Sequence, residues 1–230
     1  MSQDDFFVFC CFFFVQYTRT LTSPEVSVRV YCFHMSYLIV GLGNPDSEYE
    51  KTRHNAGRDV VRLFGEKNNL PEWHEDKKTK SLRSEGKVGK EAVTLLLPQT
   101  YVNKSGNAVL PLITSKKKAA TLVVVHDDMD LPLGRMKISF ARNSGGHKGI
   151  ESIMRAVKTN EFIRLRLGVS PTSASGKTKK PSGEEAVIKF VLGKWKGEQE
   201  QEFKTVMKRA CEALATIVTE GKERAMGEFN

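Results

Sequence analysis

The stretch Tyr37–Gly57, YLIVGLGNPDSEYEKTRHNAG, decides the fold that we expect for most of the 230-residue chain. It opens with four residues of strand character, continues into a glycine-rich turn and ends just before a helical pattern. In open α/β sheets, an apolar strand that runs into such a turn places polar side chains at the carboxyl end of the strand. Here the turn carries the carboxamide of Asn44, and the imidazole of His54 follows ten residues later.

Strand patterns recur after this stretch. Apolar runs of strand length predict buried strands at residues 92–97, 121–125 and 162–169, and an alternating run predicts a strand at 135–140. The polar, lysine-rich residues 72–91 predict two short strands with turns at Gly86 and Gly89.

Helical spacing of apolar residues lies between these strands. It predicts helices at about 56–68, 150–157 and 198–219, a helix near 105–113 that Pro111 should kink or shorten, and a short apolar element at 187–192. Asn55 is the expected N-cap of the first helix, Lys116–Lys118 an exposed linker, and residues 170–186 a flexible basic loop. Because strands and helices alternate, we expect a single three-layer α/β domain over residues 35–230, with a mostly parallel mixed sheet.

The composition limits the class of partner. The formal net charge is +9, which favours a polyanionic partner such as nucleic acid, although a generic basic surface is the alternative. The four cysteines, Cys10, Cys11, Cys32 and Cys211, lack the paired spacing of a structural zinc site. They do not suggest a disulfide scaffold either, which fits a reducing compartment.

Residues 1–34 differ from the rest of the chain. The apolar run Phe6–Val15 is ten residues long, too short to cross a bilayer as a helix. It follows Asp4 and Asp5, whereas a secretory signal carries positive charge there. We expect residues 1–34 to be a dispensable extension, disordered or a presequence; an extra strand packed on the core is the less favoured alternative.

His54 is the first candidate for chemistry. It lies in a polar turn next to a helix start, and an imidazole that titrates near neutrality can take a proton from water. Such a base needs an acceptor on its second nitrogen, and Asp127, at the end of the most buried strand, is the best candidate. The run His126–Asp130 could instead hold a divalent metal ion, which is the less favoured interpretation because no second histidine cluster pairs with it.

Other patterns narrow the reaction. Gly41-Leu42-Gly43 is not a dinucleotide-binding turn, because Asp46 occupies the third glycine position. The chain has no nucleophile elbow of the G-x-S-x-G type, so a hydrolase would use water. Asn44 and Asn103 are natural amide donors to a carbonyl or an oxyanion, although turn chemistry alone could also account for them.

The assembled motifs resemble those of the bacterial-type peptidyl-tRNA hydrolase family over about Tyr37–Gly221. In order along the chain they are VGLGNP, TRHNAG, TYVNKSG, HDDMDLPLG, GGHKG, RLRLGVSP and FVLGK. The resemblance implies a hydrolase that cleaves the ester between a peptide and the 3′-terminal ribose of tRNA, and so recycles tRNA. We expect peptidyl-tRNA as the partner, no cofactor, no metal ion, no membrane association, and a monomer in the cytoplasm or the mitochondrion.

By the same resemblance, His54 is the general base and Asp127 orients it, while Asn44 and Asn103 bind the peptide main chain. Further substrate contacts are implied for Tyr49, Tyr101, His147 and Lys148, and contacts to a tRNA phosphate for Lys137, Arg142 and Arg166. Two positions depart from the family pattern. Lys148 replaces the asparagine of the usual GGHNG, and Ser139 replaces the lysine of the phosphate clamp, so that Lys137 or Arg142 would have to substitute.

Two alternatives from other classes fit parts of this pattern. A non-catalytic RNA-binding relative, of the splicing-cofactor type, would keep the basic surface without needing a base. A metal-dependent phosphoesterase would use His126–Asp130 and would lose activity when a chelator is added.

Overall fold

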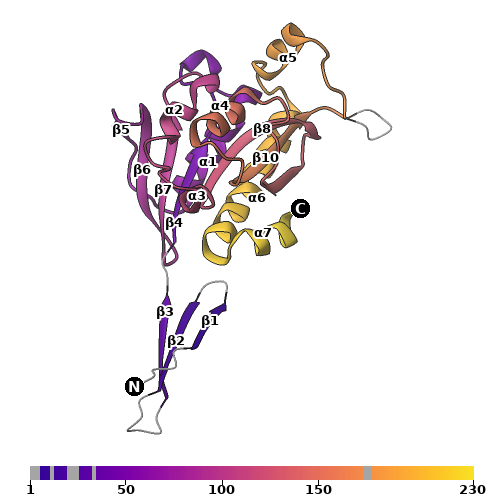
Figure 1. Cartoon of the computed structure of the whole chain (residues 1–230). Coiled ribbons are helices and arrows are strands. Elements are labelled where there is room, and N and C mark those ends of the chain that lie inside the picture. Colours follow the sequence, from indigo (N-terminus) through magenta and orange to yellow (C-terminus); the bar gives the residue numbers. More distant parts are fainter. Residues whose placement is uncertain (1–5, 11–12, 20–25, 33–34, 173–177) are drawn as a thin grey trace. The chain divides into compact units, whose positions relative to one another are not determined.

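The computed structural model of the protein describes residues 6–10, 13–19, 26–32, 35–172 and 178–230, with side chains from residue 35 onward (Figure 1). The chain divides into two compact units, the first ending at Met35 and the second spanning Ser36–Asn230. In the first, β1 (Phe6–Cys10), β2 (Phe13–Arg19) and β3 (Val26–Cys32) form an antiparallel sheet. Whether residues 1–34 are a dispensable extension stays a prediction.

The second unit is built on a seven-stranded sheet in the order β5-β6-β7-β4-β8-β10-β9. Its strands are β4 (Ser36–Gly41), β5 (His74–Asp76), β6 (Ser81–Val88), β7 (Glu91–Pro98), β8 (Leu122–Pro132), β9 (Met136–Phe140) and β10 (Ile163–Ser170). The four central strands pair in parallel, and β5, β6 and β9 add antiparallel edges. The predicted α/β domain with a mixed sheet is confirmed.

Helices surround this sheet (Figure 1). They are α1 (Ala56–Lys67), α2 (Gly106–Val109), α3 (Lys116–Ala119), α4 (Lys148–Val157), α5 (Glu184–Val191), α6 (Glu198–Glu220) and α7 (Lys222–Phe229). Three short 3-10 helices join them: η1 (Ser47–Tyr49), η2 (Arg53–Asn55) and η3 (Val102–Lys104). None of the helices that the structure describes is both long and apolar enough to cross a membrane.

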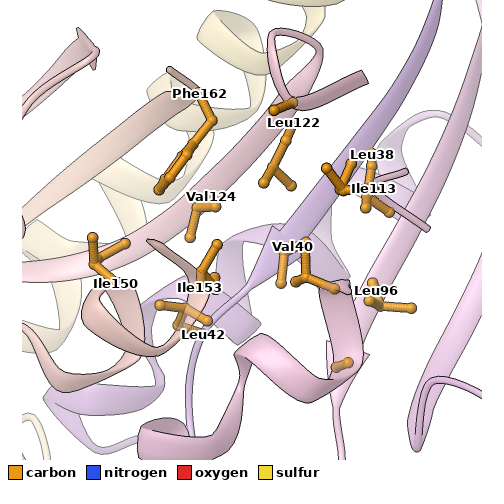
Figure 2. Close-up of a cluster of buried hydrophobic side chains, with 13 residues drawn as sticks. Leu38, Val40, Leu42, Leu96, Ile113, Leu122, Val124, Ile150, Ile153 and Phe162 are labelled. Carbon is orange, nitrogen blue, oxygen red and sulfur yellow. The ribbon is translucent and has the colours of Figure 1, made fainter. Parts of the chain in front are cut away.

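The core fixes where the central strands end. Val40 and Val124, on β4 and β8, pack with Ile150 and Ile153 of α4 (Figure 2). On β7, Leu96 belongs to the same cluster. Because successive strand residues face opposite sides of a sheet, Leu95 points to the other face, where Gly65 of α1 lies against it. Helices thus cover both faces, and the carboxyl ends of β4 and β8 meet at one edge, where open α/β sheets place their sites.

Two predictions about the sheet were wrong. The strand expected at 121–125 continues as β8 to Pro132, because its pairing with β10 extends through His126, Asp127 and Asp128. Gly86 lies inside β6 instead of in a turn, and a Cβ atom there would come within 2.7 Å of the Leu70 side chain. Gly89 does make the expected turn, with a φ of 61° that favours glycine.

The helices also differ from expectation in places. Lys116–Lys118 is not a linker but the start of α3, whose N-cap Ser115 accepts a hydrogen bond from the Lys118 backbone N–H. The helix before Pro111 is short, as expected, and ends at Val109. Helix α5 begins at Glu184, within the stretch expected to be a loop, and α7 was not predicted. Residues 173–177 of that loop lie outside the described residues.

Candidate active site

Asp127 is the centre of a hydrogen-bonded cluster near the carboxyl end of the central strands. It is only 3% exposed, and its Oδ1 accepts hydrogen bonds from His54 Nδ1 and from His147 Nε2, each 3.0 Å away. His54 lies on η2, directly before α1, and His147 is the N-cap of α4. The structure therefore brings His54 and Asp127 together, as the sequence led us to expect.

The hydrogen bonds fix which ring nitrogen of each histidine carries a proton. His147 Nδ1 accepts from the backbone N–H groups of Gly149 and Ile150, so its Nε2 must be the nitrogen that donates to Asp127. His54 donates through Nδ1, which leaves Nε2 with the lone pair. No residue that the structure describes hydrogen-bonds this Nε2, and the His54 side chain is 17% exposed, so water can reach it.

Electrostatics keep Asp127 charged and raise the basicity of His54. Burial acts to lower the pKa of His54, but the charge of Asp127 and its hydrogen bond raise that pKa above its ordinary value. Burial likewise acts to raise the pKa of Asp127, but the two imidazoles hold that pKa well below its usual range. Asp127 is thus ionised at neutral pH and can stabilise an imidazolium at His54.

His126 has a different environment from its two neighbours. Its ring lies edge-on to His147 with the centroids 4.8 Å apart, and its Nδ1 donates to the Asp127 backbone carbonyl at 2.7 Å. Burial and the neighbouring His147 lower the pKa of His126 well below its ordinary value. The ring is therefore neutral and supports the cluster by packing, and it is not placed as a second base.

Asn44 is held by two partners. Its backbone N–H donates to Asn55 Oδ1 at 2.8 Å, and Asn55 Nδ2 donates to its backbone carbonyl at 3.0 Å. Its side-chain Oδ1 accepts from the Val102 backbone N–H at 3.0 Å, which leaves the Asn44 NH₂ group as the donor for a ligand. Asn55 occupies the N-cap position of α1, but its side chain makes no cap hydrogen bond. The predicted N-cap position is confirmed, but the amide binds the Asn44 backbone in place of capping the helix.

The other candidate substrate residues lie on the neighbouring loops. Asn103 is exposed and follows Val102 on η3, so it is next to the residue that binds Asn44. Tyr101 is 52% exposed, Tyr49 is half-buried at the end of η1, and Lys148 is the exposed first residue of α4. The described contacts include no hydrogen bond from these four side chains to the Asp127 cluster.

The candidate phosphate residues lie on β9 and β10. Arg166 donates through Nε to Asp128 Oδ2 at 2.6 Å, and Lys137 stands opposite Arg166 on the neighbouring strand. Arg142 is exposed in the loop after β9. Ser139, by contrast, is buried, and it pairs with Arg164. Lys137 and Arg166 therefore lie on the same face of the sheet. Ser139 is buried and is not available to a ligand at the surface.

The run His126–Asp130 does not form one metal site. Asp127 binds the two histidines, Asp128 binds Arg166, and Asp130 pairs with Lys180. Among the described residues, the group that could hold a metal ion is His54, Asp127 and His147, whose ligand atoms lie within 4.8 Å of one another. A metal ion there would have to displace the protons that now make the hydrogen bonds to Asp127.

Comparison with known proteins decides the family. The sequence profile of a family described as Peptidyl-tRNA hydrolase matches residues 38–230, which is most of the chain. The chain belongs to the peptidyl-tRNA hydrolase family. A relative named peptidyl-tRNA hydrolase from Dehalococcoides mccartyi is 39% identical over 194 residues, and the alignment covers 84% of this chain and 98% of the relative. A second relative of that name, from Aquifex aeolicus, is 37% identical over 206 residues, and the alignment covers 84% of this chain and 95% of the relative.

A solved structure agrees with the family assignment. The crystal structure of peptidyl-tRNA hydrolase from Acinetobacter baumannii superposes with a TM-score of 0.76 at 31% identity, and covers 86% of this chain and 97% of its own. The match therefore takes in nearly all of that structure. The first described sheet, β1 to β3, precedes the part that the family profile matches.

Proposed function

We propose that the protein hydrolyses peptidyl-tRNA, cleaving the ester between the peptide and the 3′-terminal ribose. The observation that carries the proposal is the 3.0 Å hydrogen bond from His54 to Asp127, in a chain of the peptidyl-tRNA hydrolase family. It leaves His54 Nε2 as an accessible base, and Asn55, the next residue along the chain, holds Asn44 in place. The non-catalytic RNA-binding alternative has no need of this arrangement, and the relatives named above all carry the name of the hydrolase.

In the proposed mechanism, His54 Nε2 takes a proton from a water molecule as the water oxygen attacks the ester carbonyl. Asp127 stabilises the imidazolium that forms, and the Asn44 NH₂ group donates to the peptide main chain or to the developing oxyanion. When the ester C–O bond breaks, the ribose oxygen receives the proton back from His54. A base of this kind contributes about 10²–10⁴-fold to the rate. His147 holds the second hydrogen bond to Asp127 and so fixes the carboxylate.

Binding of the rest of the substrate is assigned to residues around this centre. We propose that Asn103, Tyr49 and Tyr101 contact the peptide, and that Lys148 lies beside it at the start of α4. For the tRNA, the guanidinium of Arg166 is oriented through Nε by Asp128, which leaves its terminal nitrogens for a phosphate. Lys137, opposite Arg166 in register, is the partner that would replace the missing lysine, and Arg142 is the second choice.

The test is release of peptide from N-acetyl-aminoacyl-tRNA by the wild type and by Lys148→Asn, with and without a chelator. Turnover by the wild type that the chelator leaves unchanged is the expected result. An inactive wild type that Lys148→Asn rescues would mean that the charged side chain disables an intact site. An inactive pair that still binds tRNA would favour the RNA-binding alternative, and loss of turnover on adding the chelator would favour a metal-dependent reaction.

We also propose that residues 1–34 are dispensable for this activity, that the protein acts as a monomer, and that it works in the cytoplasm or the mitochondrion. The support for the first point is that every proposed site residue lies in the unit Ser36–Asn230. A variant that begins at Met35 should keep the turnover and the melting temperature of the full chain. Light scattering after size exclusion measures the oligomeric state.

A further inference from the structure

Arg53, the residue before His54, connects the catalytic turn to the segment between α5 and α6. Its Nη1 donates to the Gly193 backbone carbonyl at 3.0 Å, and its Nη2 donates to Gln199 Oε1 at 2.9 Å. Its guanidinium lies 4.7 Å from the centre of the Phe190 ring. Backbone pairing adds to this, since the Arg53 N–H also donates to Gly193 O at 3.1 Å. The segment is therefore fixed beside the general base.

A basic groove opens at this junction. It has a volume of about 640 Å³, and Arg53, Lys189, Lys194 and Lys196 line it together with one carboxylate, that of Glu198. None of these three lysines forms an ion pair with a residue that the structure describes. Four cations against one carboxylate give the groove a strong positive potential. The proposed mechanism leaves this charge without a role.

We propose that this groove binds the phosphates of the single-stranded 3′ end of the tRNA, an inference that rests on the proposed function. Arg53 lines the groove and directly precedes His54. Consecutive Cα atoms are about 3.8 Å apart, so the wall of the groove begins at the residue next to the general base. The ester joins a peptide to a nucleotide strand. Only the nucleotide strand carries regularly spaced anions, which rows of cations bind. The groove is separate from Arg166 and Lys137, which lie on β10 and β9.

The test compares two variants, each of which neutralises three lysines in a different part of the structure. The groove variant is Lys189→Gln, Lys194→Gln, Lys196→Gln. The control variant is Lys116→Gln, Lys117→Gln, Lys118→Gln in α3, which precedes β8 and so lies at the opposite end of that strand from Asp127. Both variants remove the same charge from exposed side chains, and melting curves verify that both fold.

Binding of a fluorescent single-stranded RNA ending in CCA is measured by anisotropy at several salt concentrations. Each phosphate contact to a single strand contributes about 0.7 to the slope of log affinity against log salt. One contact therefore makes the affinity at about 0.1 M salt about 5-fold higher than at about 1 M salt. For one or two lost contacts, the groove variant should bind about 5- to 25-fold more weakly with a shallower slope, and the control variant like the wild type. The turnover of N-acetyl-aminoacyl-adenosine, which has no phosphate, should be the same in all three proteins.

Wild-type affinity and slope in the groove variant, or equal weakening in both variants, would overturn the inference. An equal loss of turnover on the phosphate-free ester would also overturn it, because the lysines would then act on the catalytic turn. If the wild type releases no peptide at all, the proposed function fails, and the RNA-binding measurement still decides for or against the groove.

Discussion

The substitution Asp127→Asn removes one negative charge and keeps an oxygen that can accept a hydrogen bond from His54. At the observed 3.0 Å between Nδ1 and Oδ1, the attraction between the carboxylate and an imidazolium is about 5.5 kcal/mol at an effective dielectric constant of about 20. The imidazolium is only partly formed in the transition state, so between half and all of this energy should be lost. The turnover rate should therefore fall by about 10²- to 10⁴-fold.

The same substitution should shift the pH profile of the reaction. His54 must be neutral to act as a base, so activity is lost as the pH falls through its pKa, which Asp127 raises. Without that charge, burial of the imidazole dominates and lowers the pKa, so the acid limb of the profile should move to lower pH.

Single-turnover release of peptide from N-acetyl-aminoacyl-tRNA, measured from about pH 5 to about pH 9, tests both effects. A variant that melts like the wild type but keeps its rate, or keeps the acid limb where it was, would refute the assignment of Asp127.

Three further predictions concern binding and stability. Arg166→Gln should weaken tRNA binding and reduce the slope of log affinity against log salt by about 0.9 per duplex phosphate lost, whereas an unchanged slope would move the phosphate site elsewhere. Asn55→Ala leaves two buried backbone groups of Asn44 unpaired, at about 1–3 kcal/mol each, so urea unfolding should show the loss and kcat/KM should fall; unchanged values would remove Asn55 from the account. Burial raises the pKa of Asp59 to about 6, so its ionisation destabilises the fold as the pH rises above the unfolded pKa of about 3.9. Asp59→Asn should therefore increase the free energy of unfolding at pH 8 by at most about 3 kcal/mol, with a higher Tm, and leave Tm nearly unchanged at pH 4. A gain that is the same at both pH values would contradict the ionisation argument.

Local patterns predicted the elements whose burial follows from the sequence alone. Helix α6 was expected at 198–219 because Phe203, Leu214 and Ile217 recur at helical spacing, and all three are buried. The run at 121–125 was expected to be a central strand because it is continuously apolar over the length of a strand. The extent of β8 was not predictable in this way, because residues 126–132 are mostly polar and are held in the strand by pairing with β10.

The residues of the site were predictable where the chemistry of a side chain indicates its role. They were not predictable where the role depends on a contact between distant chain segments. An imidazole beside a carboxylate acceptor led to His54 and Asp127. The second hydrogen bond to Asp127 depends on the placement of the start of α4, twenty residues further along the chain, and no local pattern encodes that placement. Asn55 was interpreted as a helix cap, since the position next to α1 gives no sign that its amide binds Asn44.

The most direct test of the central claim is the rate of peptide release from N-acetyl-aminoacyl-tRNA by the wild type and by His54→Ala, at saturating enzyme and with melting curves for both. The structure predicts that the wild type turns over and that His54→Ala is slower by about 10²- to 10⁴-fold while it remains folded. A folded His54→Ala variant that releases peptide at the wild-type rate would contradict the claim that His54 is the general base.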